Sequence, residues 1–292
     1  MKKIAYIFCL LFICSLMVIA EQNPWVLKIY PAQDVFQGES VVITAQVPPG
    51  TQSKDLFINV FDTNYSLYLV KENEYRLPLG IHMDKNPGNY KVVLVYKNQQ
   101  KSAFFLNVKK KAYKISTIYL NQKNKQLITS KNLFYESNLI GSLFKKVKTT
   151  LYYGQKNFVK PAPGKITSDY GMGRKYQDTQ GKIVDTWRHR GVDIASSSDK
   201  RVLAANGGQV ILANMFQVHG GTIMIDHGQG IISIYAHLGK LLVKNGEQVK
   251  RGQSIAELGS TGVSTGPHVH FGLSVANVRV NPMQWVDRPM IR

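Results

Sequence analysis

Two histidines near the C-terminal end of the chain have a spacing that could serve a metal ion or a hydrolytic reaction. The stretch GPHVHFG, residues 266–272, reads as a short apolar strand interrupted by these two side chains. Successive side chains of a strand point to opposite faces, so His268 and His270 share one face while Val269 and Phe271 share the other. This geometry can contribute to a metal site, but two histidines cannot hold the ion alone.

Three further groups upstream complete a set that suits zinc-dependent hydrolysis. His189 and Asp193 are four positions apart in WRHRGVDIA, with Gly191 between them, and His237 lies in IYAHLGK. A hydrolytic zinc site needs three protein ligands and one open position for water, and mixed His and Asp ligands suit Zn²⁺. Five candidate groups therefore leave two side chains for catalysis.

The elements that must position these residues read as short β-strands broken by many glycines. From Phe158 onward the predicted strands are GGQVILAN, TIMIDHG, IISIYAHL, LLVKNGEQV and SIAEL, with Asn245-Gly246 as a tight-hairpin signal. The pattern predicts a compact, glycine-rich antiparallel β domain. Alternation along IISIYAHL places Ser233, Tyr235 and His237 on one face, which predicts that His237 points out of the core. No glycine-rich phosphate loop stands between a strand and a helix, so nucleotide binding has no support.

As an ordered set these motifs resemble the lysostaphin-type, or LytM-type, zinc metallopeptidases that cut peptidoglycan peptides. The resemblance rests on His189-x-x-x-Asp193, on Tyr235-Ala236-His237-Leu238 and on GPHVHF, and SDYGMGRKY, DHG and STGVSTGPH add to it. It covers residues 159–287, which are predicted to be the peptidase domain. The chain as a whole is then expected to be mainly β.

The resemblance implies that His189, Asp193 and His270 bind one Zn²⁺, and that His237 and His268 form the catalytic pair. Zinc can bring the pKa of a bound water to about 7 and polarise the scissile carbonyl. A neutral imidazole can then accept the proton of the water, and a second, donating histidine can stabilise the oxyanion. Which histidine does which remains open.

Other residues of this domain have more ordinary interpretations. His227, at a strand end, is predicted to make a structural hydrogen bond, and His219 to lie in a loop at the rim of the site. Tyr170 and Arg174 either line the cleft or support the fold. Residues 175–187 are read as a loop that shapes the groove. No HExxH motif occurs, which disfavours a thermolysin-like scaffold with a glutamate base.

The N-terminal part of the chain alternates apolar and polar residues in short runs separated by Pro- and Gly-containing turns. VVITAQV, LFINVF and YKVVLVY are examples, and they predict a small immunoglobulin-like β-sandwich over residues 24–108. This region has no cluster of catalytic residue types. Its lone histidine, His82, is expected on the surface.

Residues 109–158 form a predicted basic linker with a short amphipathic helix. Between Lys109 and Lys160 the sequence has twelve lysines and a single acid, Glu136. Such a run is either a solvated face or linker, or an electrostatic tether to an anionic polymer. Apolar residues recur there at helical spacing, so the helix should pack on a domain, with membrane-surface binding as the alternative. These residues are Leu139, Ile140, Leu143, Phe144 and Val147.

Residues 1–20 are predicted to be a signal peptide, with two lysines at the start, an apolar run and small residues before a cleavage site. An uncleaved membrane anchor is the alternative. Both cysteines, Cys9 and Cys14, lie in this leader, so any metal of the mature chain must be held by His, Asp or Glu. No later segment is long and apolar enough to cross a bilayer.

The formal charge of +19 would be +17 without the two leader lysines. Such an exported protein, in the periplasm, cell envelope or medium, is expected to meet anionic envelope polymers, and export disfavours nucleic acid as a partner.

These observations together predict an exported zinc endopeptidase acting on peptide cross-links of peptidoglycan in cell-wall remodelling, of the D,D-endopeptidase type. The alternative is a non-enzymatic cell-wall-binding regulator of other peptidoglycan hydrolases, because the family includes such members. Retention of all five motif residues favours the enzyme. A third class, a biotinyl or lipoyl carrier, is suggested by the hairpin-like VKNGEQVKRGQSI, but no lysine sits at a tight turn with the flanking residues that such carriers use.

Overall fold

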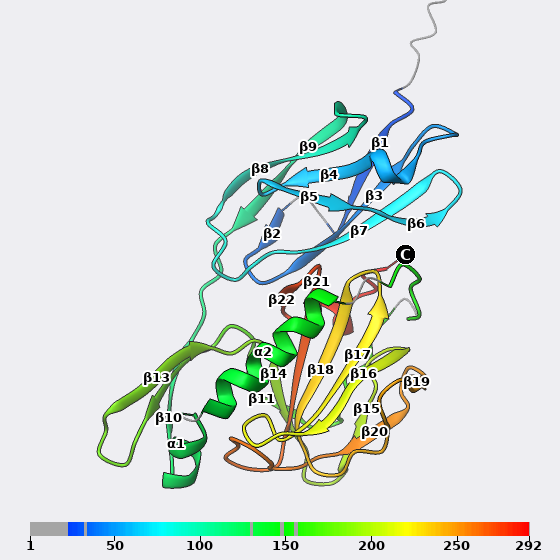
Figure 1. Cartoon of the computed structure of the whole chain (residues 1–292). Coiled ribbons are helices and arrows are strands. Elements are labelled where there is room, and N and C mark those ends of the chain that lie inside the picture. The colour runs from blue at the N-terminus through cyan, green and yellow to red at the C-terminus, as the bar shows by residue number, and fades with distance from the viewer. Residues whose placement is uncertain (1–22, 32–33, 129–130, 147–148, 155–156, 292) are drawn as a thin grey trace, which may run out of the picture.

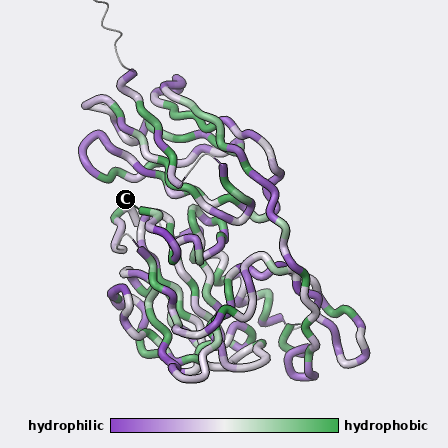
Figure 2. Tube along the Cα trace, turned by 180° about the vertical axis from the view of Figure 1, so that it is seen from behind, coloured by the Kyte–Doolittle hydropathy of each residue, from purple (hydrophilic) through white to green (hydrophobic). Residues whose placement is uncertain are grey.

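The computed structural model describes residues 23–31, 34–128, 131–146, 149–154 and 157–291. The predicted signal peptide, with Cys9 and Cys14, lies outside these residues, as does Val147. The described chain is mainly β (Figure 1). Apolar stretches run through the strands, whereas many connecting loops are hydrophilic (Figure 2). Among the described residues, no helix has the length and apolar character needed to cross a membrane.

The N-terminal unit consists of two sheets that enclose a common apolar core. The first sheet has the order β1 (Val26–Tyr30), β3 (Ser40–Gln46), β7 (Glu74–Gly80) and β6 (Tyr68–Lys71). The second has the order β2 (Asp34–Phe36), β9 (Gln99–Lys109), β8 (Gly88–Tyr96), β4 (Leu56–Val60) and β5 (Thr63–Ser66), and η1 (Ser53–Asp55) precedes β4. Ile43 and Leu77 from the first sheet pack with Ile58 and Leu94 from the second. This is the predicted sandwich plan, and VVITAQV, LFINVF and YKVVLVY supply β3, β4 and β8.

In its described residues, the segment predicted to be a basic linker contains one strand and two helices. They are β10 (Ile115–Tyr119), α1 (Gln122–Ile128) and α2 (Lys131–Lys146). β10 pairs in parallel with β12 (Gly173–Gln177), which pairs antiparallel with β13 (Ile183–Arg188). Residues 175–187 are therefore largely a β-hairpin, where the sequence had suggested a loop.

Helix α2 carries the predicted amphipathic pattern and lies across one face of the C-terminal sheet (Figure 1). Ile140 and Phe144 are buried against Met224, Ile232 and Ile234. Because the sheet already covers the apolar face of the helix, the structure favours packing on the domain over membrane-surface binding.

The C-terminal unit is built on an eight-stranded antiparallel sheet, as the sequence predicts. Its order is β11-β14-β21-β18-β17-β16-β19, with β22 paired to β21. The bounds are β11 (Lys165–Ser168), β14 (Val192–Ala195), β16 (Gly208–Met215), β17 (Gly221–Gly228), β18 (Ile231–Leu238), β19 (Gln248–Val249), β21 (Val269–Val275) and β22 (Val278–Val280). The remaining elements are the β15 (Arg201–Leu203) and β20 (Ser254–Glu257) pair and α3 (Met283–Asp287). Tyr235, Phe271 and Trp285 fill the core on the face opposite α2.

The tight hairpin predicted at Asn245-Gly246 is only partly correct. The turn exists, since Gly246 has φ +84° and the Glu247 N–H donates to the Lys244 carbonyl at 3.2 Å. Residues 241–243, however, form no strand with β19, which pairs with β16 instead. The sequence pattern correctly indicates the turn, but it does not determine with which strand β19 pairs.

The two β units are joined by buried hydrogen bonds around Ser40 on β3. Its N–H donates to Gln284 Oε1 at 2.8 Å, and Gln284 Nε2 donates back to the Ser40 carbonyl at 2.9 Å. The indole N–H of Trp285 donates to Ser40 Oγ at 2.9 Å. Since all three residues are buried, the N-terminal unit is anchored directly on the unit that carries the candidate site.

Candidate metal centre

Three donor atoms from distant parts of the chain converge at one end of the C-terminal sheet. Asp193 on β14 and His270 on β21 are directly opposite in the strand register, and His189 precedes β14. Asp193 Oδ1 lies 3.0 Å from His189 Nε2 and 3.1 Å from His270 Nδ1, and the two nitrogens are 2.9 Å apart. Ligands at about 2.0–2.1 Å from a tetrahedral ion are separated by about 3.3 Å, so this triangle has nearly the size of one face of a zinc coordination shell.

His189 is held in the tautomer that a metal ligand requires. Its Nδ1–H donates to the Asp169 carbonyl at 2.9 Å, which leaves the lone pair on Nε2, inside the triangle. The side chain is fully buried, and burial lowers the pKa of His189 even though Asp193 acts to raise it. The neutral imidazole is therefore the favoured form.

Arg174 on β12 fixes the other oxygen of the carboxylate. Its Nη2 donates to Asp193 Oδ2 and, at 2.8 Å, to Ser168 Oγ, so that Oδ1 is left for the triangle. Burial alone would raise the pKa of Asp193, but the close contacts of its carboxylate with the imidazoles of His189 and His270 outweigh burial, and the pKa lies below its ordinary value. Of the two interpretations of Arg174, the structure supports the one that places it in the cleft.

Gly191 makes room for the ring of His270. A Cβ at this position would lie 2.7 Å from both Cε1 and Nε2 of His270, and 2.5 Å from the Phe271 carbonyl oxygen. A side chain here would therefore push one donor out of the triangle. The sequence shows a glycine between His189 and Asp193, but only the fold shows that this glycine makes room for the ring of His270.

His237 and His268 lie beside the triangle with their rings 4.9 Å apart. His268 Nδ1–H donates to the Gly266 carbonyl at 2.8 Å, and His237 Nδ1–H donates to the Thr261 carbonyl at 3.0 Å. Each imidazole thus keeps Nε2 for another partner, and His268 Nε2 lies 3.8 Å from Asp193 Oδ1. The structure brings all five predicted residues together and distinguishes three converging donors from two neighbours.

The orientation of His237 has a different cause from the one that alternation suggests. Ser233 and Tyr235, which should share its exposed face, are fully buried, whereas His237 is half-buried. His237 has φ +62°, and the β17–β18 register shifts at this end of the strand. A non-glycine residue in the left-handed region is uncommon, and this local break in the strand lets the ring turn away from the core. Burial and the charge of His268 lower the pKa of His237 to about 3.

A cleft of about 490 Å³ opens over the site, and part of its wall comes from the segment predicted to be a linker. Ile118 and Leu120 line it together with Tyr176 of β12 and the 263–268 loop. Asn124 Nδ2 of α1 donates to the Ser264 carbonyl at 3.2 Å. β10 and α1 therefore belong to the architecture of the cleft, which basic composition alone did not indicate.

The structure tests the sequence-based interpretations of Tyr170, His227 and His82. Tyr170 donates to the Arg279 carbonyl at 2.7 Å and is buried, so it supports the fold. His227 is fully buried, with Nδ1–H donating to the Gly207 carbonyl at 2.7 Å and Nε2 lying 2.8 Å from Ser233 Oγ. The predicted structural role of His227 is confirmed, and burial lowers its pKa to about 4. His82 is exposed, as expected.

His219 lies in the loop between β16 and β17, as the sequence predicts, and Glu136 of α2 holds its side chain. Its Nδ1 lies 2.8 Å from Glu136 Oε2, and that buried carboxylate also accepts the backbone N–H groups of residues 217–219 at 2.9–3.2 Å. The His219 carbonyl accepts the N–H of His237 at 3.0 Å. The sequence feature that could have indicated this contact is Glu136, the single acid among the lysines of residues 109–160.

Comparison with known proteins agrees with this geometry. Residues 187–282 match the description Peptidase family M23. Over 134 residues, 46% of this chain and 30% of the relative, the chain is 38% identical to "Peptidoglycan DD-endopeptidase ShyB" of Vibrio cholerae. Over 116 residues, 38% of this chain and 30% of the relative, it is 35% identical to "Murein hydrolase activator NlpD" of Escherichia coli. The chain thus spans about a third of the length of these curated relatives.

The fold of most of the chain also has a solved counterpart. A crystal structure from Pseudomonas aeruginosa, described as a peptidase M23, superposes with a TM-score of 0.61 at 22% identity and covers 88% of this chain and 96% of that one. At this identity the likeness shows the fold. With the sequence match over 187–282, it leads to one conclusion: the chain carries a LytM-type domain of peptidase family M23.

Proposed function

We propose that the chain is an exported zinc-dependent endopeptidase that hydrolyses peptide cross-links of peptidoglycan during cell-wall remodelling. The observation that carries this proposal is the triangle of His189, Asp193 and His270 with His237 and His268 beside it in one cleft. The relatives named peptidoglycan DD-endopeptidases support the substrate class, and we extend that activity to this chain as a D,D-endopeptidase.

His189, Asp193 and His270 would hold the ion through two imidazole nitrogens and one carboxylate oxygen. Two nitrogens and one oxygen are a donor set that suits zinc, and the spacing of the atoms fits its tetrahedral shell. When bound, zinc supplies Lewis acidity, which activates a water molecule and polarises the scissile carbonyl at neutral pH. Asp169 and Arg174 keep two of the three ligands in the binding orientation.

His237 and His268 would carry the proton transfers at their Nε2 atoms. Each ring is anchored through Nδ1–H to a backbone carbonyl, so Nε2 is the basic atom of the neutral form. One imidazole accepts the proton of the attacking water at Nε2, and the other, in its protonated form, donates from Nε2 to the oxygen of the scissile carbonyl as negative charge develops. The cleft wall formed by β10, α1 and β12 would exclude bulk water and guide the peptide.

The remaining parts of the proposal concern location and domain roles. Export through the leader would bring a chain of strongly positive charge to anionic polymers of the periplasm or cell envelope. Residues 24–108 would serve as an accessory unit and residues 159–287 as the peptidase. Cell-wall substrate and envelope polymers, and no nucleic acid, are then the partners.

The alternative is a non-enzymatic regulator of other cell-wall hydrolases. It is favoured by relatives named as murein hydrolase activators and by the position of β10 and α1 in the wall of the cleft. A regulator does not need the metal for hydrolysis, whereas the peptidase requires both zinc and the two neighbouring histidines. Zinc content and bond cleavage therefore separate the two functions.

The experiment uses residues 21–292, loaded with zinc, and purified cross-linked muropeptides. A shorter chain starting at residue 159 would lack α2 and would expose Met224, Ile232 and Ile234. We expect products whose masses match cleavage of the cross-link, and the reaction should stop with a chelator and resume with added zinc. The exposed His82→Ala variant is the matched control and should remain active. A folded, zinc-loaded protein that leaves every cross-link type intact would contradict the enzyme proposal.

A further inference from the structure

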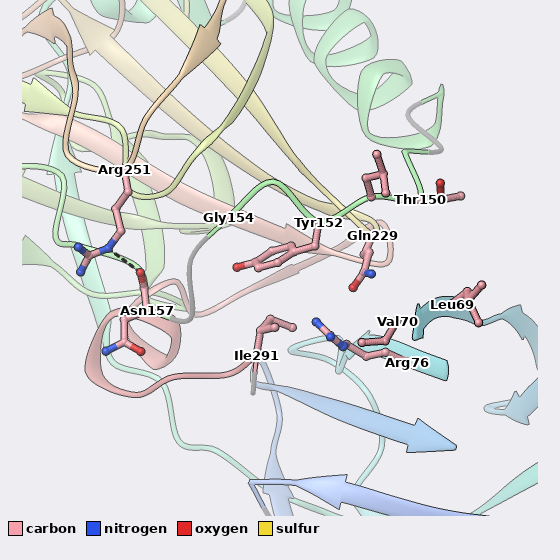
Figure 3. A pocket seen from close by; sticks show the side chains of 11 residues that line it. Leu69, Val70, Arg76, Thr150, Tyr152, Gly154, Asn157, Gln229, Arg251 and Ile291 are labelled. Atoms are coloured by element: carbon pink, nitrogen blue, oxygen red, sulfur yellow. Dashed lines mark hydrogen bonds between the residues drawn. The ribbon is translucent and has the colours of Figure 1, made fainter. Parts of the chain in front are cut away.

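A second cavity, of about 830 Å³, lies between the N-terminal and C-terminal units and shares no described lining residue with the metal cleft (Figure 3). Val70 and Arg76, from β6 and β7, form part of one wall. Tyr152, Gln229 and Ile291 of the C-terminal half form part of the other. A volume of this size is typical of small-molecule sites, for which about 300–1,000 Å³ is usual.

Arg76 brings a buried positive charge to this cavity. On β7 its neighbours Tyr75 and Leu77 face the core of the sandwich, so Arg76 faces the opposite way. The residue is 6% exposed, and its Nη1 is buried with no hydrogen-bond partner among the described residues. Burial lowers the pKa of Arg76, yet a guanidinium keeps its charge at any physiological pH. A buried charge with an unsatisfied donor costs free energy, which a bound anion would offset.

Gln229 supplies a second unsatisfied group in the same cavity. It is 3% exposed, and its Oε1 has no hydrogen-bond partner in the described part of the chain. Figure 3 shows the Arg76 guanidinium and the Gln229 amide reaching toward a common space from the two walls. Among the described lining residues there is no Asp or Glu. Glu74, two positions before Arg76 on β7, acts electrostatically on the guanidinium, but it lies outside the described lining and pairs with Lys71 at 3.1 Å.

We propose that this cavity binds the C-terminal carboxylate of a short peptide. The planar guanidinium of Arg76 matches a carboxylate through two parallel hydrogen bonds. The second arginine of the described lining, Arg251, is exposed and donates to the Asn157 carbonyl at 2.7 Å, so Arg76 is the buried cation and suits a singly charged anion better than a phosphate. The apolar side chains of Val70 and Ile291 offer contacts for small aliphatic groups of the peptide, and the Gln229 amide can pair with a peptide N–H. The site is independent of the zinc centre.

The test measures dissociation constants by calorimetry with residues 21–292 and four probes. They are acetyl-Ala-Ala with a free carboxylate, its C-terminal amide, acetate and inorganic phosphate. The free acid should bind at least tenfold more tightly than each of the others. Equal binding of acid and amide, or tighter binding of phosphate, would overturn the proposal. Acetate that binds as tightly as the dipeptide would reduce the cavity to a simple anion site and would also overturn it.

Variants tie the binding to Arg76. Arg76→Met should weaken binding of the acid at least tenfold, and Lys91→Met, which removes an exposed cation of β8 that does not line the cavity, should not change it. Arg76→Lys keeps the charge but loses the planar fork, so it should weaken binding several-fold and serves if the Met variant does not fold. Wild-type affinity in both Arg76 variants would overturn the proposal. His268→Ala should bind the dipeptide normally, which separates this result from the outcome of the peptidase assay.

Discussion

Glu136 on α2 contacts His219 in the loop between β16 and β17, with 2.8 Å between Glu136 Oε2 and His219 Nδ1. The same carboxylate accepts three backbone N–H groups of that loop, and the His219 carbonyl accepts the N–H of His237. Glu136, in the lysine-rich segment, is thus connected through His219 to the backbone of His237, which we propose to be catalytic. α2 positions part of the site in addition to covering the sheet.

Replacing Glu136 with Ala should lower the free energy of unfolding by about 3–5 kcal/mol, because several buried donors lose a charged acceptor. Urea unfolding measures this change. Asn138→Ala, an exposed position of the same helix, is the control and should change stability by less than about 0.5 kcal/mol. Equal stability of the two variants would show that Glu136 does not anchor the loop.

Gly191→Ala should weaken zinc binding about tenfold or more without altering any donor. The added Cβ would lie 2.7 Å from His270 Nε2, so the ring must move out of the triangle. Competition with a chromophoric chelator gives the zinc affinity. Gly141→Ala, where an added Cβ meets nothing within 4 Å, is the matched control and should bind zinc as the unmodified protein does. Unchanged affinity in Gly191→Ala would place His270 outside the metal site.

Arg174→Ala should also reduce zinc affinity, by about 10–100-fold, because Asp193 loses the donor that orients its second oxygen. The exposed neighbour Lys175 gives a control, Lys175→Ala, for the loss of one positive charge near the cleft. If Arg174→Ala and Lys175→Ala lose the same amount of zinc affinity, the cause is the loss of positive charge near the cleft and not the loss of the hydrogen bond to Asp193.

His227 should make the metal-free protein less stable in mild acid. Burial lowers the pKa of His227 in the folded state to about 4 from its ordinary value of 6.5, so the unfolded chain binds the proton first as pH falls. Stability is therefore full above pH 6.5 and declines toward pH 4. Between pH 7 and pH 4.5 this one residue should contribute a loss of about 2 kcal/mol. Urea unfolding of His227→Gln should show a pH dependence smaller by that amount, and an identical pH dependence would contradict it.

Much of the fold and the site could be read from the sequence, because both depend on local patterns. Alternation located β3, β4, β8 and β18, and the ordered His and Asp motifs identified the five residues that the structure brings together. What could not be read depends on contacts between distant segments. The pairing of β10 with β12, the hydrogen bonds to Glu136 and the bulge that turns His237 all require the tertiary structure. The alternation rule misplaced Ser233 and Tyr235, whose face lies in the core, and His237 turns away from the core only because the strand breaks there.

The central claim is that the two histidines of GPHVHFG, which share a strand face, have different tasks. The most direct test is the zinc content of His270→Ala and His268→Ala, measured by mass spectrometry beside muropeptide cleavage by the same samples. His270→Ala should lose both zinc and cleavage, whereas His268→Ala should keep its zinc and lose cleavage. Loss of zinc from His268→Ala alone, or cleavage by that variant at the unmodified rate, would contradict the account.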